Sequence, residues 1–244
     1  MPPYVLEGRE RLGDARSKVT RRPRSKLERV LDALGARAAV VRRPEVDLGV
    51  QLALACLVSA RVSAGDARDL VRRLCDADGQ VEPAQLALVS DADLAGVCPP
   101  ELARSVVEAL HAVGHLVADG ATGDSWDPED TRRAISGVPG MLPSRADYLL
   151  LSAGRLATVA PSAAVMRVAV RVGYPGSTYG AVARALDLEL PYAGDIASAW
   201  RAHQLLDQHG RTVCTALRPA CGSCPIREGC GFAGEGDDPA ARLA

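Results

Sequence analysis

Four cysteines near the end of the sequence constrain this chain more than any other feature. Cys214, Cys221, Cys224 and Cys230 have the spacing C-x6-C-x2-C-x5-C and fall within 17 residues. Four thiolates this close together can bind a tetrahedral zinc ion or a cubane iron–sulfur cluster. Zinc sites usually use two well-separated C-x2-C pairs, and Pro225 stops any helix from continuing after the third cysteine. The pattern favours a loop wrapped around an iron–sulfur cluster, with zinc as the alternative.

The other three cysteines stand among apolar residues. Cys56, Cys75 and Cys98 are therefore expected to be small core side chains. Seven cysteines in a chain without a signal-peptide pattern favour metal binding over disulfides. No apolar run approaches the roughly 18 residues of a transmembrane helix. We expect a cytoplasmic protein with no membrane partner.

The composition predicts a nearly all-α fold. Ala, Leu and Val dominate the 48% of residues that are hydrophobic, and only 3% are aromatic. Ala and Leu favour helices, whereas aromatic residues favour strands. Apolar patterns predict helices over 27–34 and 145–153, two within 48–74, and two or three within 83–116. Asp127 should cap a further helix that begins at Pro128.

The formal net charge of −1 gives no overall attraction to nucleic acid, but the charge is uneven. Seven basic residues and one acidic residue lie between Arg16 and Arg29. Residues 1–25, rich in Arg, Gly and Pro, are expected to form a flexible basic arm. Such an arm can contact phosphates, or it can be a solvated tail.

The segment around the four cysteines resembles a known family. Residues 209–214 read H-G-R-T-V-C and residues 218–224 read R-P-A-C-G-S-C. This resembles the end of endonuclease III and its adenine-glycosylase relatives, which are helix–hairpin–helix, iron–sulfur DNA glycosylases. The resemblance is specific over residues 209–230 and weaker over roughly 46–208. It implies a [4Fe–4S] cluster on the four cysteines and base-excision repair of damaged double-stranded DNA.

The resemblance also implies an architecture. A six-helix barrel would lie beside a cluster domain, with DNA bound across the cleft between them and a target base flipped into it. The barrel is expected at residues 42–156, and the cluster domain at 26–41 and 157–232. Residues 233–244 would form a tail. The protein is expected to be monomeric.

The hairpin that grips DNA phosphate in this family is altered. The family pattern L-P-G-V-G-R-K-T-A corresponds here to residues 138–146, V-P-G-M-L-P-S-R-A. Gly140 matches the first glycine, Leu142 replaces the second, and Pro143 has no N–H to donate. A turn is still expected, but a plain helix–turn–helix corner is the alternative to a phosphate site.

Both catalytic positions implied by the resemblance hold serine. Ser144 stands where bifunctional relatives have the lysine that forms a Schiff base, and Ser162, 18 residues later, stands where relatives have aspartate. A serine hydroxyl is neutral and cannot stabilise an oxocarbenium-like sugar by charge. Asp147, one helical turn after Ser144, is interpreted as a surface or capping acid. No catalytic residue is assigned with confidence, so enzymatic activity stays open.

The DNA contacts that the resemblance suggests are Gly140, Arg61, Arg211 and Arg218. Arg61 follows L-V-S-A, where relatives carry a glutamine wedge, and an exposed arginine at a helix end is the alternative. Three functions compete. They are a DNA-binding repair protein with replaced catalytic residues, a monofunctional glycosylase with a non-standard carboxylate, and a non-catalytic iron–sulfur interaction or redox protein. The sequence identifies no lesion.

Overall fold

The computed structural model describes residues 23–38, 42–192 and 194–234 of the chain. Within these ranges the regular elements are helices, apart from one isolated antiparallel bridge between Cys75 and Val81. The prediction of an all-α protein is confirmed. The expected arm at 1–25 and tail at 233–244 lie mostly outside the described residues.

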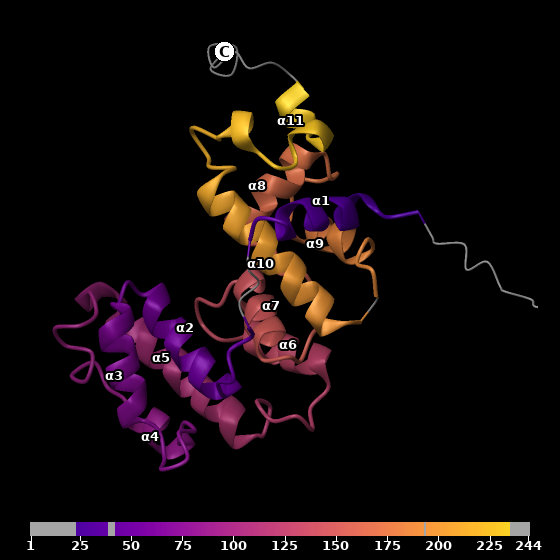
Figure 1. Ribbon diagram of the computed structural model, residues 1–244. Helices are drawn as coiled ribbons and strands as arrows, with labels where there is room; N and C mark the ends of the chain where they lie inside the picture. The colour runs from indigo at the N-terminus through magenta and orange to yellow at the C-terminus, as the bar shows by residue number, and fades with distance from the viewer. Residues whose placement is uncertain (1–22, 39–41, 193, 235–244) are drawn as a thin grey trace, which may run out of the picture.

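The helices follow one another along the chain with short connections (Figure 1). They are α1 (Lys26–Gly35), α2 (Leu48–Ser59), α3 (Ala64–Arg73), α4 (Pro83–Leu88), α5 (Pro100–Ala118), α6 (Pro128–Ser136), α7 (Pro143–Ser152), α8 (Ala163–Val172), α9 (Tyr179–Asp187), α10 (Ile196–Thr212), η1 (Cys221–Ser223), η2 (Arg227–Gly229) and α11 (Gly231–Gly234). No helix in the described part of the chain is both long and apolar enough to cross a lipid bilayer.

Local capping residues explain where several helices begin. Ser25 and Glu28 form a reciprocal capping box at the start of α1. Asp127 accepts hydrogen bonds from the backbone N–H groups of Glu129 and Asp130, and Pro128 occupies the first turn of α6. Capping satisfies N–H groups that have no partner within the helix. The predicted start of α6 is confirmed.

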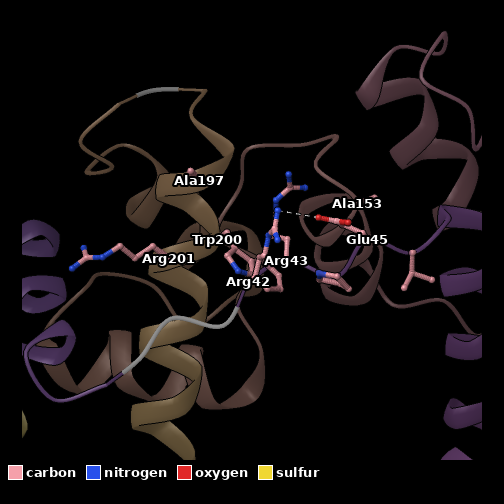
Figure 2. A pocket seen from close by; sticks show the side chains of 9 residues that line it. Arg42, Arg43, Glu45, Ala153, Ala197, Trp200 and Arg201 are labelled. Atoms are coloured by element: carbon pink, nitrogen blue, oxygen red, sulfur yellow. Dashed lines mark ion pairs between the residues drawn. The ribbon is translucent and has the colours of Figure 1, made fainter.

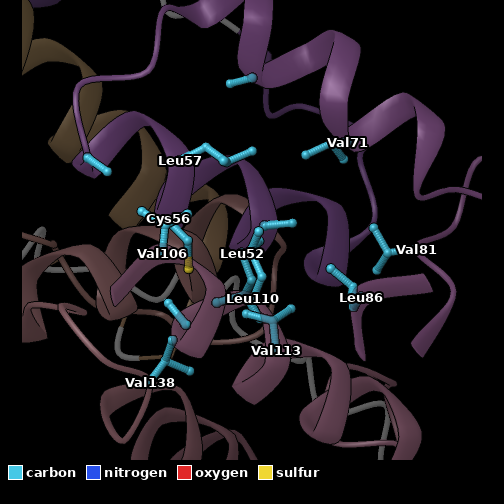
Figure 3. Close-up of a cluster of buried hydrophobic side chains, with 14 of the residues drawn as sticks. Leu52, Cys56, Leu57, Val71, Val81, Leu86, Val106, Leu110, Val113 and Val138 are labelled. Atoms are coloured by element: carbon cyan, nitrogen blue, oxygen red, sulfur yellow. The ribbon is translucent and has the colours of Figure 1, made fainter. Parts of the chain in front are cut away.

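Buried apolar side chains form two clusters. The first is built by α2 to α7 and includes Leu150 of α7. Figure 3 shows part of it, with Leu52 of α2 and Leu110 of α5. The second is built by α1, the end of α7, α8, α9 and α10, and includes Leu151 and Val168. In Figure 1, α2 to α5 lie on one side of α6 and α7, while α1, α8, α9 and α10 lie on the other. The predicted domain boundaries stay a prediction.

Helix α7 belongs to both clusters, because Leu150 packs into the first and Leu151 into the second. Helices α8 and α10 approach closely next to it. A Cβ on Gly210 of α10 would lie only 2.7 Å from the carbonyl oxygen of Ala164 in α8. Only glycine allows this backbone approach. The starts of α7 and α8 and one face of α10 are thereby held in fixed positions.

Candidate functional site

The four clustered cysteines line one small cavity against α8 and α10. The cavity is otherwise mainly apolar, with Val168, Val172 and Ile226 in its wall. All four thiols are half-buried. Burial, followed by the nearby thiols of the other three cysteines, raises the pKa of Cys224 above its ordinary value, although a backbone hydrogen bond from Ile226 opposes the rise. The other three thiols are therefore near enough to influence the ionisation of Cys224.

Arginine and histidine side chains support the cysteine loop. Arg171 Nη1 lies 3.2 Å from Cys214 Sγ and also donates to the carbonyl oxygen of Thr215 at 2.7 Å. Arg167 donates from Nε to the carbonyl oxygen of Cys214 at 2.8 Å. His209 Nε2 lies 3.7 Å from Cys224 Sγ. Hydrogen-bond donors aimed at ligand sulfurs stabilise thiolates and tune a cluster.

The donor set fits an iron–sulfur cluster. Four thiols from one loop share a cavity with an apolar wall, and cationic and imidazole groups lie beside two of the sulfurs. Among the described residues, no three histidine, cysteine, aspartate or glutamate side chains, these four thiols included, lie close enough together to hold a single metal ion.

The remaining cysteines follow the prediction in two of three cases. Cys56 and Cys98 are buried, whereas Cys75 is half-buried and its thiol lies 3.1 Å from the carbonyl oxygen of Val71. Burial raises the pKa of Cys56 to about 12, although Arg145 opposes the rise. A thiol with so high a pKa is unreactive at neutral pH. The description of Cys75 as a core side chain was wrong, because it lies at the edge of the apolar cluster.

The altered hairpin between α6 and α7 is still a turn. Gly140 has φ +74°, in the left-handed region that glycine adopts without strain. The N–H of Met141 donates to the carbonyl oxygen of Val138 at 3.0 Å, and Pro143 begins α7. Leu142 is 58% exposed and directs an apolar side chain outward at the hairpin. Neither the N–H of Met141 nor Pro143 can therefore bind a phosphate here.

Ser162 is the N-cap of α8 and makes two hydrogen bonds. Its oxygen accepts from the backbone N–H of Val165 at 3.2 Å, and its hydroxyl donates to Asp207 Oδ1 at 2.5 Å. Arg211 Nε donates to Asp207 Oδ2, also at 2.5 Å. Burial raises the pKa of Asp207, but the hydrogen bonds from Arg211 and Ser162 outweigh it, so this pKa is lowered overall. An ionised carboxylate therefore lies beside Ser162.

Asp147 is not the surface or capping acid that the sequence suggested. Its side chain is only 1% exposed, and Arg132 binds it with Nε on one carboxylate oxygen and Nη2 on the other, the second at 3.0 Å. The hydroxyl of Tyr179 donates to the same carboxylate. The interpretation was wrong because Arg132 and Tyr179 lie 15 and 32 residues away in the sequence. The helical spacing around Asp147 does not reveal contacts at such separations. Asp147 fastens α7 to α6 and α9 and is closed to a ligand.

Aromatic rings lie between α7 and α10 next to Asp207. The ring centroids of Tyr148 and His203 are 5.1 Å apart, and those of Tyr148 and Trp200 are 6.2 Å apart. Tyr148 is 36% exposed, and it lies one turn after Ser144 on the same side of α7. His203, Asp207 and Arg211 recur at every fourth residue of α10, so they share one face. That i, i+4 spacing is the signal by which Asp207 could have been found from the sequence.

The suggested DNA contacts fall into two groups. Gly140 lines one hollow together with Ser59 and Ala60 at the end of α2 and the neighbouring hairpin residues Pro139 and Met141, and Arg61 follows Ala60 directly in the chain. Arg211 and the exposed Arg218 lie instead on α10 and the cysteine loop. Arg61 has φ +65°, and no other described non-glycine residue has a positive φ. Left-handed backbone costs such a residue about 1 kcal/mol or more.

A larger hollow of about 770 Å³ opens on the other side of Trp200 (Figure 2). Arg42, Arg43 and Glu45 line it from the segment before α2, and Arg201 lines it from α10. Arg42 is paired with Glu45 at 3.2 Å, and Arg43 Nη1 lies 3.4 Å from the carbonyl oxygen of Ser152. Arg201 points away from the other two arginines in Figure 2.

Known proteins resemble this chain in both sequence and fold. The iron–sulfur binding domain of endonuclease III matches residues 214–230. Endonuclease III of Rickettsia conorii is 32% identical over 105 residues, which are 43% of this chain and 48% of the relative. Endonuclease III of Treponema pallidum is 30% identical over 97 residues, 40% of this chain and 44% of the relative. The chain spans less than half the length of these curated relatives.

The structural likeness extends further along the chain. A non-covalent endonuclease III–DNA complex has a TM-score of 0.61 at 20% identity, covering 86% of this chain and 97% of the other. A thermostable thymine-DNA glycosylase has a TM-score of 0.59 at 18% identity, covering 86% of this chain and 95% of the other. The fold and the cysteine loop together define an all-helical protein that shares the architecture of solved endonuclease III structures. The chain is similar to endonuclease III, and its residues 214–230 match the iron–sulfur binding domain of that enzyme.

Proposed function

We propose that this chain is an iron–sulfur protein of base-excision repair that binds damaged double-stranded DNA, with the usual glycosylase and lyase residues replaced. The observation that carries the proposal is the cysteine loop on an endonuclease III fold, combined with serine at positions 144 and 162. Cys214, Cys221, Cys224 and Cys230 would hold a [4Fe–4S] cluster. When bound, the cluster would fix the loop that carries Arg218 beside the end of α10.

Arg61 supports a role in DNA binding because its backbone is strained. In the left-handed position just after α2, glycine or asparagine is the favoured residue. Arginine is less stable there, so its presence is best explained by what its side chain contacts. Arg61 is exposed and directly follows Ala60, which lines the same hollow as Gly140. We infer that it contacts DNA at the damaged base pair.

Two variants separate this role from a structural one. Arg61→Gly should raise the free energy of unfolding by about 0.5–1 kcal/mol because glycine relieves the strain. The same variant should weaken binding to a duplex with an abasic-site analogue more than binding to an intact duplex. Arg72→Ala, which removes an exposed charge on α3, is the control. Equal losses of DNA affinity in both variants would contradict a specific role for Arg61.

Salt dependence tests the electrostatic part of the proposal. Each phosphate contact contributes about −0.9 to the slope of log affinity against log salt concentration. Deleting residues 1–22 should make this slope shallower. The deletion should stop there, because Arg24 pairs with Asp32 at 2.9 Å and Ser25 caps α1. Absence of DNA binding at low salt would overturn the proposed function.

A monofunctional glycosylase with a non-standard carboxylate is the second candidate. The hydrogen bond from Ser162 to Asp207 favours it, because it keeps a negative charge beside the position that an aspartate holds in relatives. A non-catalytic interaction or redox role is the third candidate. It would be favoured by a protein that holds iron but binds neither intact nor damaged DNA.

A further inference from the structure

Asp147, Asp187, Glu189 and Asp207 lie near α7, α8 and α10, and the first three are held by partners that fix the fold. Asp147 is buried under Arg132 and Tyr179. Asp187 binds the hydroxyl of Thr158 and the backbone N–H of Val159, each at 2.7 Å, and burial raises its pKa. Glu189 accepts from Tyr174 and from the N–H of Leu27. The fourth, Asp207, differs from all of these.

Asp207 is held by groups that leave it reachable. Its side chain is 19% exposed, and its partner Arg211 is 68% exposed. Because the guanidinium of Arg211 is mostly in contact with solvent, it can exchange the carboxylate for a phosphate at little cost. Ser162 is the other partner, and it is itself the N-cap of α8. The carboxylate is therefore oriented by the hydroxyl of a helix cap and paired with an exposed cation.

The surroundings suit a positively charged ligand. Tyr148 from α7 and His203 from α10 lie on the same side as Asp207. Burial lowers the pKa of His203, and its Nδ1 lies 2.8 Å from the carbonyl oxygen of Ala160, so the imidazole is neutral at pH 7. Arg211 is thus the cation held directly against this carboxylate.

We propose that Asp207 is the carboxylate that faces the deoxyribose of a flipped-out nucleotide, and that Ser162 and Arg211 position it. This inference rests on the proposed function. In the step it would assist, the C1′–N bond breaks with both electrons leaving on the base, and the sugar becomes an oxocarbenium ion. Water then adds at C1′, and the proton it loses ends on the departing base. The charge of Asp207 stabilises the cationic sugar.

Cation preference tests the proposal without requiring turnover. The probes are two duplexes, one with a neutral tetrahydrofuran abasic analogue and one with a pyrrolidine analogue that carries a positive charge at the sugar. The wild-type protein should bind the pyrrolidine duplex at least about tenfold more tightly, as transition-state mimics do. Asp207→Asn should bring the two affinities within about twofold while binding to the tetrahydrofuran duplex persists.

Three further variants guard the interpretation. Asp195→Asn removes the same charge from the start of α10, where asparagine caps equally well, and should keep the preference. The exchange Ser162→Asp/Asp207→Ser moves the carboxylate to the other end of the same hydrogen bond and should also keep it. If Asp207→Asn does not fold, Ser162→Ala is compared with the wild-type protein instead. It should weaken the preference for the pyrrolidine duplex.

The outcomes separate this inference from the function on which it rests. Equal affinity of the wild-type protein for both duplexes would overturn the role of Asp207 and leave DNA binding intact. A preference unchanged by Asp207→Asn would overturn it as well. Binding to neither duplex, at low salt, would overturn the proposed function and this inference together.

Discussion

The contact between Arg132 and Asp147 predicts a large loss of stability from one substitution. Arg132 is in α6 and Asp147 is in α7, on the two sides of the hairpin. Replacing Arg132 by alanine would leave a carboxylate that is 1% exposed with only the hydroxyl of Tyr179 as a partner. A buried charge without its counter-ion is costly, because it has lost its water and gained nothing in return.

The magnitude can be estimated from the exposure of the two partners. Removing one member of a buried ion pair costs about 3–5 kcal/mol. The side chain of Arg132 is 37% exposed, so water already weakens the pair and the lower end applies. We expect Arg132→Ala to lower the free energy of unfolding by about 3 kcal/mol. For a chain of this size each kcal/mol lowers Tm by roughly 2–4 °C, which gives a fall of about 6–12 °C.

Urea unfolding followed by circular dichroism measures this, with the neighbouring arginine as the control. Arg133 pairs with Asp130 at 2.7 Å, but both side chains are more than half exposed. Arg133→Ala should therefore cost under about 0.5 kcal/mol. The double variant Arg132→Ala/Asp147→Asn should be more stable than Arg132→Ala, because no unpaired charge stays buried. Equal stabilities of Arg132→Ala and Arg133→Ala would refute the reasoning.

Three other outcomes are expected. Arg171→Leu, which removes the donor to Cys214 Sγ, should hasten loss of visible absorbance in air, with iron content as the check. His203 has a lowered pKa, so the unfolded chain binds its proton first and the free energy of unfolding should fall as pH drops below about 6.5; His203→Gln should flatten that dependence. Borohydride should trap no covalent complex through Lys26. The ammonium of Lys26 lies 5.0 Å from the ring centre of Tyr174, at the C-terminal end of α8, whereas Ser162 lies at the N-terminal end of that helix.

Features that depend on neighbouring residues could be predicted from the sequence. The start of α6 is an example, because Asp127 needs only the next three residues to cap it. The cysteine loop is another, since its four cysteines lie within 17 residues and line one cavity. Gly140 likewise has a positive φ set by its own turn. In each case the determining contacts span a few residues.

Features that depend on residues far apart in the chain could not be predicted from the sequence. Asp147 meets Arg132 and Tyr179, which are 15 and 32 residues away, and its burial is set by how α6, α7 and α9 pack. Ser162 and Asp207 are 45 residues apart. The sequence showed a neutral side chain at position 162 and could not show the charge beside it.

The structure shows different surroundings at the two positions that the resemblance marks as altered. At the start of α7, Pro143 has no N–H, and the N–H of Met141 is bonded to the carbonyl oxygen of Val138 within the turn. At the start of α8, the neutral hydroxyl of Ser162 donates to Asp207, so a negative charge lies within one hydrogen bond of it. Under the proposed function, we therefore expect weak binding to the DNA backbone together with a negative charge retained at the sugar. The expected substrates are lesions that are already easy to expose, because less binding energy is available to extrude a nucleotide from the duplex.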